Sequence, residues 1–237
     1  MVPLIRVAGL TKRYGVHFVL DGVNLDVHPG EALALLGANG AGKTTLLKII
    51  ATLVRPSAGV VAVAGHDCVR EAERVRRDIG YVAHGSHLYE DLTAAENLRF
   101  WTELAGKPVG REAILSALAA IELEAVADDT VRTLSAGMQR RLSLARLLLV
   151  PPRVLLLDEP FASLDQRAGK WLEEHLLARK TRGAAIVMST HSFGRELDVV
   201  DRVAILAEGR VAVAVRREGL TVDELQRLYA MHAEGRA

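Results

Sequence analysis

The chain has 237 residues, half of them hydrophobic, and a formal net charge of +1 at pH 7. Acidic and basic residues are interspersed, which gives no electrostatic case for binding nucleic acid or a bare anionic membrane. A single cysteine excludes an internal disulfide and fits a reducing compartment. The N-terminus lacks the features of a signal peptide, and no apolar stretch reaches the eighteen or so residues that span a bilayer. We therefore expect no nucleic-acid partner, no direct membrane insertion and one large α/β domain.

The predicted elements begin with a small antiparallel β-sheet. Short apolar runs alternate with turns up to about residue 30, and residues 60–64 continue that pattern. The apolar run 31–36 fits a buried strand, and residues 45–50 favour a helix. Residues 79–83 favour a strand that returns to the core. These signals predict a small antiparallel β subdomain beside an α/β core.

From about residue 85 to about residue 150 the signals change to those of helices. Thr93 can cap a helix over residues 94–103, and Glu96, three residues further on, completes a capping box. Residues 110–121 and 136–150 favour two more helices. We interpret this stretch as an α-helical subdomain inserted in the α/β core.

Strand and helix signals alternate again after residue 150. The expected strands cover residues 153–157, 184–188 and 202–206, and the expected helices cover residues 166–181 and 221–233. Such alternation indicates a mostly parallel sheet with helices on its faces. We therefore predict a single domain over residues 1–237, with the helical insertion at about 85–150.

A glycine-rich loop joins the predicted strand 31–36 to the helix that follows it. Its glycines allow a tight turn that aims backbone N–H groups at one point, and the helix dipole adds to the attraction for phosphate. The pattern predicts that Lys43 reaches the β- and γ-phosphates and that the Thr44 hydroxyl holds Mg²⁺. The expected nucleotide-binding residues here are Gly37, Ala38, Asn39, Gly40, Ala41, Gly42, Lys43, Thr44 and Thr45.

A second candidate site element is a buried strand that ends in two carboxylates, Asp158 and Glu159. The carboxyl end of a strand is where ligands bind in open α/β sheets, so Asp158 is the natural partner of Thr44 around Mg²⁺. Glu159, one step further, is placed to polarise an attacking water. The two residues therefore predict a metal ligand and a catalytic base.

With these motifs the chain resembles the ATP-binding subunit of an ABC transporter over nearly its whole length. The matching segments, in chain order, are Tyr14 and residues 37–44, 134–139, 154–159, 163–165 and 189–191. The resemblance implies the ABC-type P-loop NTPase fold. It also implies that ATP and Mg²⁺ are the cofactors and that Tyr14 stacks on the adenine.

The resemblance further implies that two subunits, expected to be identical copies, pack head to tail. Each phosphate loop then faces residues 134–139 of the partner, here called the signature loop. Ser135 and the Gly137 N–H, at a helix start, would bind the γ-phosphate held by the other copy. His191 would contact the γ-phosphate and help Glu159 position water. The catalytic residues implied are Glu159, His191 and Lys43.

The partners implied are this second ATP-binding subunit and transmembrane transporter subunits, with the chain peripheral at the cytoplasmic face of the cell membrane. ATP would close the dimer and hydrolysis would reopen it. Nothing in the nucleotide site names the transported substrate, so the ATPase of a drug, lipid or polysaccharide exporter stays open. A soluble ABC ATPase in cluster assembly or DNA maintenance is the alternative of another class.

Two positions depart from the common family pattern. Ala136 replaces a glycine of the signature loop, and His84 stands where most of the family has a glutamine that reaches Mg²⁺ and water. His84 is therefore a third candidate metal ligand beside Thr44 and Asp158. Together with the signature loop, the run that ends in Phe161 and the short length, His84 makes the chain most similar to the haem-exporter ATPase of cytochrome c maturation.

Overall fold

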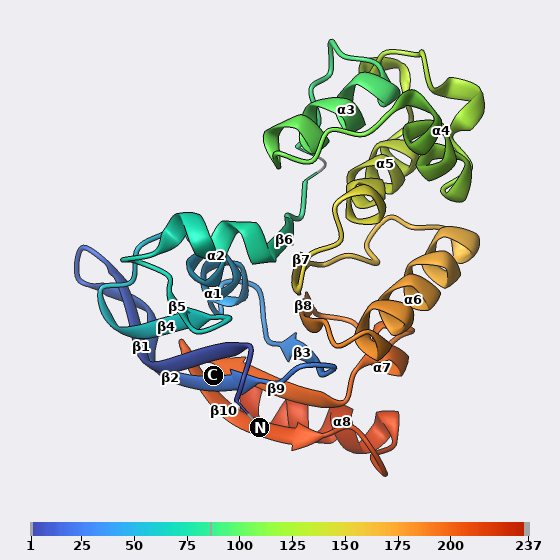
Figure 1. Ribbon diagram of the computed structural model, residues 1–237. Helices are drawn as coiled ribbons and strands as arrows, with labels where there is room; N and C mark the ends of the chain where they lie inside the picture. The colour runs from blue at the N-terminus through green and yellow to red at the C-terminus, as the bar shows by residue number, and fades with distance from the viewer. Residues whose placement is uncertain (1, 86, 235–237) are drawn as a thin grey trace.

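The computed structural model describes residues 2–85 and 87–234, and these residues form two β-sheets (Figure 1). The first is antiparallel, in the order β2-β1-β4-β5. Its strands are β1 (Ile5–Tyr14), β2 (His17–Val27), β4 (Ala58–Val63) and β5 (His66–Asp67). It confirms the predicted antiparallel sheet: β1 pairs with β2 and β4 with β5 across short turns, and β4 also pairs with β1, which is distant in sequence.

The second sheet has the order β10-β9-β3-β8-β7-β6. Its strands are β3 (Ala32–Leu36), β6 (Ile79–Val82), β7 (Val154–Asp158), β8 (Ala185–Thr190), β9 (Arg202–Ala207) and β10 (Arg210–Arg216). All pairs are parallel except β9 with β10. The mostly parallel core is thereby confirmed.

Strand β3 lies in the middle of this sheet and is buried on both faces. Leu33 and Leu35 pack into one hydrophobic cluster with the antiparallel sheet and helix α1 (Lys43–Ile50). Ala34 and Leu36 pack into a second cluster on the opposite face. Successive strand residues point to opposite faces, so a strand covered on both sides must be apolar throughout. The helices on the second face are α6 (Gln166–Thr181), α7 (Glu196–Val199) and α8 (Val222–Tyr229).

Three helices form a group beside the sheets, at the upper right of Figure 1, and the last of them also packs on the parallel sheet through Leu144 and Leu147. They are α3 (Ala94–Leu104), α4 (Arg111–Ala120) and α5 (Ala136–Leu149), with short 3₁₀ turns at Glu124–Val126 and Val131–Thr133. They share a hydrophobic cluster of their own. The predicted capping box is present at Thr93 and Glu96, which exchange side-chain and backbone hydrogen bonds. The helical segments lie where the sequence predicts them; their description as a subdomain inserted in one domain stays a prediction.

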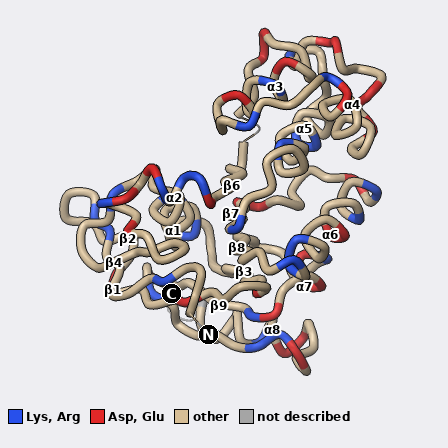
Figure 2. Tube along the Cα trace, in the orientation of Figure 1, with Lys and Arg blue, Asp and Glu red and all other residues tan. Residues whose placement is uncertain are grey.

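The structure also contains elements that the sequence patterns do not indicate. Helix α2 (Ala72–Asp78), helix α7 and strand β10 are additions to the predicted set. The closing helix is α-helical only as far as Tyr229 and continues as a π-helical turn over Ala230–Glu234. Along the chain trace, Lys and Arg positions lie among Asp and Glu positions in both the sheets and the helical part (Figure 2). Within the described ranges, no helix is long and apolar enough to cross a membrane.

Candidate nucleotide-binding and hydrolysis site

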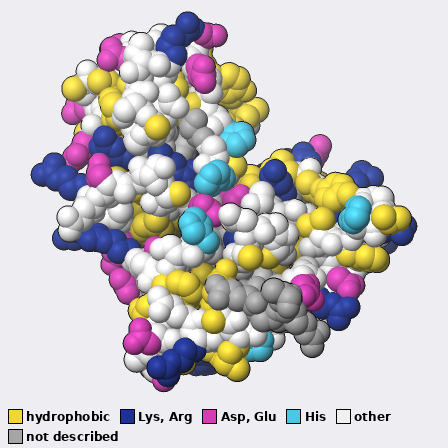
Figure 3. All heavy atoms as spheres, turned by 180° about the vertical axis from the view of Figure 1, so that it is seen from behind, with side chains coloured by type: hydrophobic (Ala, Val, Ile, Leu, Met, Phe, Trp, Pro, Cys, Tyr) yellow, Lys and Arg dark blue, Asp and Glu magenta, His cyan; other side chains and the backbone are white. Residues whose placement is uncertain are grey.

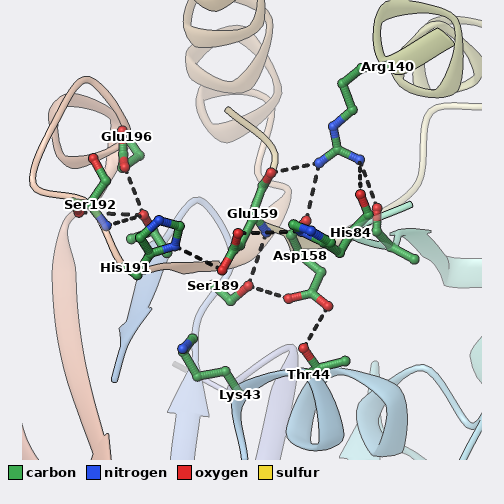
Figure 4. A network of polar contacts seen from close by, with 12 residues as sticks. Lys43, Thr44, His84, Arg140, Asp158, Glu159, Ser189, His191, Ser192 and Glu196 are labelled. Atoms are coloured by element: carbon green, nitrogen blue, oxygen red, sulfur yellow. Dashed lines mark hydrogen bonds and ion pairs between the residues drawn. The ribbon is translucent and has the colours of Figure 1, made fainter. Parts of the chain in front are cut away.

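Four loops meet at the carboxyl ends of the parallel strands. The phosphate loop, residues 37–42, follows β3, and His84 lies two residues beyond β6. Asp158 ends β7 and pairs in register with Ser189 of β8, the strand that lies between β7 and β3. Ligands bind at this edge of open α/β sheets. Figure 4 shows the side chains that the edge brings together.

The phosphate loop requires glycine at two positions for steric reasons. Gly42, which directly precedes α1, has φ +105°, and a Cβ there would lie 2.7 Å from the Val19 carbonyl oxygen and from Leu20 Cδ2. A Cβ at Gly37 would lie 2.5 Å from the carbonyl oxygen of Leu206. No side chain fits such contacts, so the backbone itself forms the floor of the loop.

Lys43 holds its ammonium inside the loop. Its Nζ donates to the carbonyl oxygens of Gly37 at 2.6 Å and Ala38 at 3.1 Å. Burial lowers the Lys43 pKa, whereas the negative charges of Glu159 and Asp158 raise it. The carbonyl oxygens and carboxylates therefore keep a cation at the N-terminus of α1, where a phosphate would bind.

Thr44 and Asp158 form the pair predicted to hold Mg²⁺. Thr44 Oγ1 donates to Asp158 Oδ2 at 2.8 Å, and the other carboxylate oxygen accepts a hydrogen bond from Ser189 Oγ. Both groups present oxygen, the ligand type that Mg²⁺ prefers, and Mg²⁺ usually takes only one or two protein ligands beside phosphate oxygens and waters. In the part of the chain that the structure describes, no cluster of three or more His, Cys, Asp or Glu is placed to hold a metal. The Thr44 hydroxyl and the Asp158 carboxylate are oxygen donors that fit a magnesium ion shared with a nucleotide.

Glu159 lies between two imidazole rings. His191 Nδ1 is 2.9 Å from Glu159 Oε1, and His84 Nδ1 is 3.4 Å from Oε2. The Glu159 side chain is only 17% exposed, whereas those of His84 and His191 are 66% and 60% exposed. Glu159 also has φ +49°, a left-handed conformation that residues other than glycine rarely adopt. The turn directs the carboxylate towards the edge of the sheet.

His84 was predicted as a third metal ligand, and the structure places its ring on Glu159. No hydrogen bond or ion pair among the described residues joins it to Thr44 or Asp158. All three nevertheless line one cleft of about 510 Å³, which lies between α1, β6 and the helices α3 and α5. Seen from behind, histidine and acidic side chains meet at the junction of the two parts of the molecule (Figure 3). A metal contact of His84 stays a prediction.

Three site residues have no role in the sequence-based prediction. Ser189 donates to Asp158 and accepts a hydrogen bond from the Glu159 N–H at 3.1 Å. The buried Glu196 accepts from Thr190 Oγ1 at 2.7 Å and so shapes the loop that carries His191. Arg140 reaches the ends of β6 and β7. Ser189 belongs to a segment that matches the family, whereas Arg140 directly follows the signature loop in the basic pair Arg140-Arg141, which was the only local signal for it.

Tyr14, Ser135 and Gly137 lie apart from this edge. Tyr14 ends β1 with 52% of its surface exposed, and the Lys12 ammonium lies 4.7 Å from its ring centroid. Ser135 is the exposed N-cap of α5, and its Oγ accepts from the Met138 N–H at 3.3 Å. Across the described residues, no hydrogen bond links these three to the phosphate loop of the same chain. Their nucleotide contacts stay predictions.

A phosphate loop that leads into α1, an adjacent hydroxyl–carboxylate pair and a carboxylate held by histidines define a P-loop nucleotide-binding protein. The chain belongs to the ABC transporter family, whose profile matches residues 20–162. It is therefore an ABC ATP-binding subunit, with ATP and Mg²⁺ as cofactors. The ABC-type fold predicted from the sequence is confirmed.

Relatives with different substrates are similar to the chain. The Nod factor export ATP-binding protein I of Ralstonia nicotianae is 37% identical over 94% of this chain and 70% of its own length. The daunorubicin resistance ATP-binding protein DrrA3 of Streptomyces coeruleorubidus is 38% identical over 94% and 69%. The sulfate/thiosulfate import ATP-binding protein CysA of Bradyrhizobium diazoefficiens is 37% identical over 87% and 62%. The chain thus spans 62–70% of the length of these relatives.

Solved structures agree over almost the whole chain. The ATP-binding subunit of an ABC transporter superposes with a TM-score of 0.88 at 30% identity, covering 95% of this chain and 98% of that one. A dimeric ATP-binding cassette in a post-hydrolysis state, bound to ADP and Pi, gives a TM-score of 0.82 at 29% identity, covering 91% and 100%.

Proposed function

We propose that the chain hydrolyses ATP as the motor subunit of a membrane transporter, peripheral at the cytoplasmic face of the membrane. The observation that carries the proposal is the position of Glu159. Its carboxylate lies one residue beyond the predicted metal ligand Asp158 and 2.9 Å from His191 Nδ1. A carboxylate in such a position can accept a proton from water that attacks the γ-phosphate.

The remaining residues of the site bind and orient. Lys43 would exchange its two carbonyl partners for β- and γ-phosphate oxygens, and Thr44 and Asp158 would hold Mg²⁺. When bound, Mg²⁺ neutralises charge on the phosphate oxygens. His191 Nδ1 holds one oxygen of Glu159 and His84 Nδ1 lies 3.4 Å from the other, so the two rings together would orient the carboxylate towards an attacking water. Phosphoryl transfer depends mainly on such positioning and charge neutralisation.

We propose further that two copies of the chain close around ATP. Ser135 and Gly137 support this, because they are accessible at the N-terminus of α5 and bind nothing of the phosphate loop in their own chain. A helix N-terminus of this kind attracts the γ-phosphate of a nucleotide on another copy. The similar cassette bound to ADP and Pi is itself dimeric. Tyr14 would stack on the adenine.

The variant Glu159→Gln tests the proposal, since it should bind ATP, hydrolyse it at least roughly 10²-fold more slowly and remain as a closed dimer. Size-exclusion chromatography with light scattering, with ATP and Mg²⁺, would detect this dimer. Glu173→Gln, which changes a charge on α6 away from the site, should behave like the wild type. Lys43→Ala should form no dimer with ATP. A Glu159→Gln chain that stays monomeric at saturating ATP would contradict the proposal.

For the transported substrate, we propose haem in cytochrome c biogenesis, supported by His84, the signature loop and the run that ends in Phe161. Export of a drug or lipid-like molecule is a second candidate, because similar subunits serve Nod factor export and daunorubicin resistance. An affinity pull-down from gently solubilised membranes, with mass spectrometry and an absorption spectrum, distinguishes them. Multi-span partners with haem-handling components support haem export. Other membrane partners contradict it, and soluble partners alone contradict the transporter proposal.

A further inference from the structure

Arg140, on the second turn of α5, joins the two loops that carry His84 and Glu159. One terminal nitrogen of its guanidinium donates to the carbonyl oxygens of Ala83 at 2.8 Å and His84 at 3.5 Å. The other donates to those of Asp158 at 3.2 Å and Glu159 at 2.7 Å. A single side chain thus holds the carboxyl ends of β6 and β7 (Figure 4).

The contacts of Arg140 are unusual for a buried cation. The residue is 5% exposed, and every hydrogen bond that its terminal nitrogens make in the described ranges goes to a backbone carbonyl. Burial lowers its pKa, whereas the charges of Asp158 and Glu159 raise it. Burying a charge without a direct carboxylate partner is unfavourable. The planar guanidinium, with donors that diverge in a fork, is the side chain that can span two strand ends at once.

The backbone conformation of Glu159 depends on the hydrogen bond from Arg140. Its φ of +49° is a conformation that must be imposed by surrounding contacts. Ser189 binds the Glu159 N–H at 3.1 Å, and Arg140 binds the Glu159 carbonyl at 2.7 Å. The peptide groups on both sides of the left-handed residue are therefore held, and its carboxylate is directed at His191 and His84.

We propose that Arg140 is a positioning residue that orients Glu159 and His84 for ATP hydrolysis from the helix of the signature loop. The inference rests on the proposed catalytic role of Glu159. Ser135 and Gly137 begin the same helix, one turn before Arg140. In a head-to-tail dimer, a chain's signature loop serves one nucleotide while its Glu159 serves the other. Arg140 thereby links the two ATP sites mechanically.

Steady-state ATPase kinetics and nucleotide binding of Arg140→Gln, in the full purified chain, test the proposal. Arg140 has no contact with the phosphate loop, so KM and nucleotide affinity should stay within about twofold of the wild type. A misplacement of Glu159 by about 1 Å should lower kcat roughly 10–100-fold. Arg140→Lys should recover little of the loss, because one ammonium cannot reach both strand ends. If Arg140→Gln does not fold, the same kinetic measurements on Arg140→Lys test the proposal.

Arg141→Gln is the matched control. Arg141 is the next residue of α5, but it donates to the Ile121 carbonyl at 3.0 Å and pairs with Glu122, away from both loops. This variant should keep the wild-type kcat. Equal kcat values for the Arg140 and Arg141 variants would overturn the proposal.

A double-mutant cycle separates positioning from a general structural effect. If Arg140 acts through Glu159, Arg140→Gln should lower the residual activity of Glu159→Gln by less than about twofold. Independent, multiplicative losses would overturn the role of Arg140 and leave the function of Glu159 intact. If Glu159→Gln instead hydrolysed ATP as fast as the wild type, that result would overturn the proposed function and, with it, the role of Arg140.

Discussion

Replacing Ser189 with alanine should lower the free energy of unfolding, because the buried carboxylate of Asp158 loses a hydrogen-bond donor. Ser189 is fully buried, and its hydroxyl donates to Asp158 Oδ1 while it accepts the N–H of Glu159. Asp158 is itself 2% exposed, so water cannot replace the lost donor without a rearrangement. Thr44 still binds the other carboxylate oxygen. The variant therefore leaves one oxygen of a buried carboxylate without its partner.

The expected loss in the free energy of unfolding follows from these contacts. A hydrogen bond to a charged group contributes about 1.5–3 kcal/mol. The Glu159 N–H keeps a second acceptor, the Ser189 carbonyl oxygen at 3.2 Å, so its share of the loss is small. We therefore expect Ser189→Ala to cost about 2 kcal/mol. Ser143→Ala is the matched control, because Ser143 is equally buried but donates to a neutral carbonyl, that of Arg140, at 2.7 Å. It should cost about 1 kcal/mol or less.

Urea unfolding at pH 7, followed by the fluorescence of the two tryptophans, measures both variants. The dependence on urea should be unchanged, so that the shift in midpoint reports stability alone. The reasoning is refuted if Ser189→Ala costs no more than Ser143→Ala, because the buried charge would then add nothing to the hydrogen bond.

Two further predictions concern stability at other positions of the chain. Burial lowers the pKa of His175 from 6.5 to about 4, so between these pH values the unfolded chain binds a proton that the folded chain does not, and stability falls on acidification. His175→Phe can keep the stacking on Trp171 but cannot bind the proton. The free energy of unfolding should therefore fall by roughly 1 kcal/mol less in the variant than in the wild type between pH 7 and pH 5, after allowance for the partial exposure of His175. Urea midpoints with the same pH dependence in both proteins would contradict this. Gly42→Ala should destabilise by more than about 3 kcal/mol, because its Cβ meets Leu20 and backbone, whereas Gly40→Ala, with open space but φ +84°, should cost about 1 kcal/mol. Equal melting temperatures of these two variants would show that the close approach at Gly42 is unimportant.

The sequence predicts those parts of the fold that a short segment decides by itself. Thr93 and Glu96 complete a capping box within four residues, so the start of α3 can be read directly. The phosphate loop can also be recognised from one short segment, because its glycines and Lys43 lie close together in sequence, although the close contacts at Gly37 and Gly42 come from distant residues. Strand β3, and strand β7 up to its last residue Asp158, are continuous apolar runs, as burial on both faces requires.

The elements that escaped prediction have weak local signals. Helix α2 buries only Val75 and is otherwise mostly charged, so it lacks the apolar stripe that identifies a helix. Strand β10 alternates exposed and half-buried residues at the edge of the sheet and depends on β9 for its pairing. In both cases the neighbouring elements, and not the segment, decide the conformation.

The contacts that set the geometry of the site join residues far apart in sequence, so a local sequence pattern cannot predict them. Ser189 Oγ reaches Asp158 across 31 residues, and Arg140 reaches Ala83 across 57. The same strand and helix could form with other side chains there, so no pattern in either segment demands these residues. A motif identifies which groups meet phosphate, whereas buried polar contacts decide where those groups lie, because each must be paired once it is removed from water. His84 illustrates the difference: its place in the motif predicts a metal contact, and the loop that Arg140 holds brings its ring to Glu159.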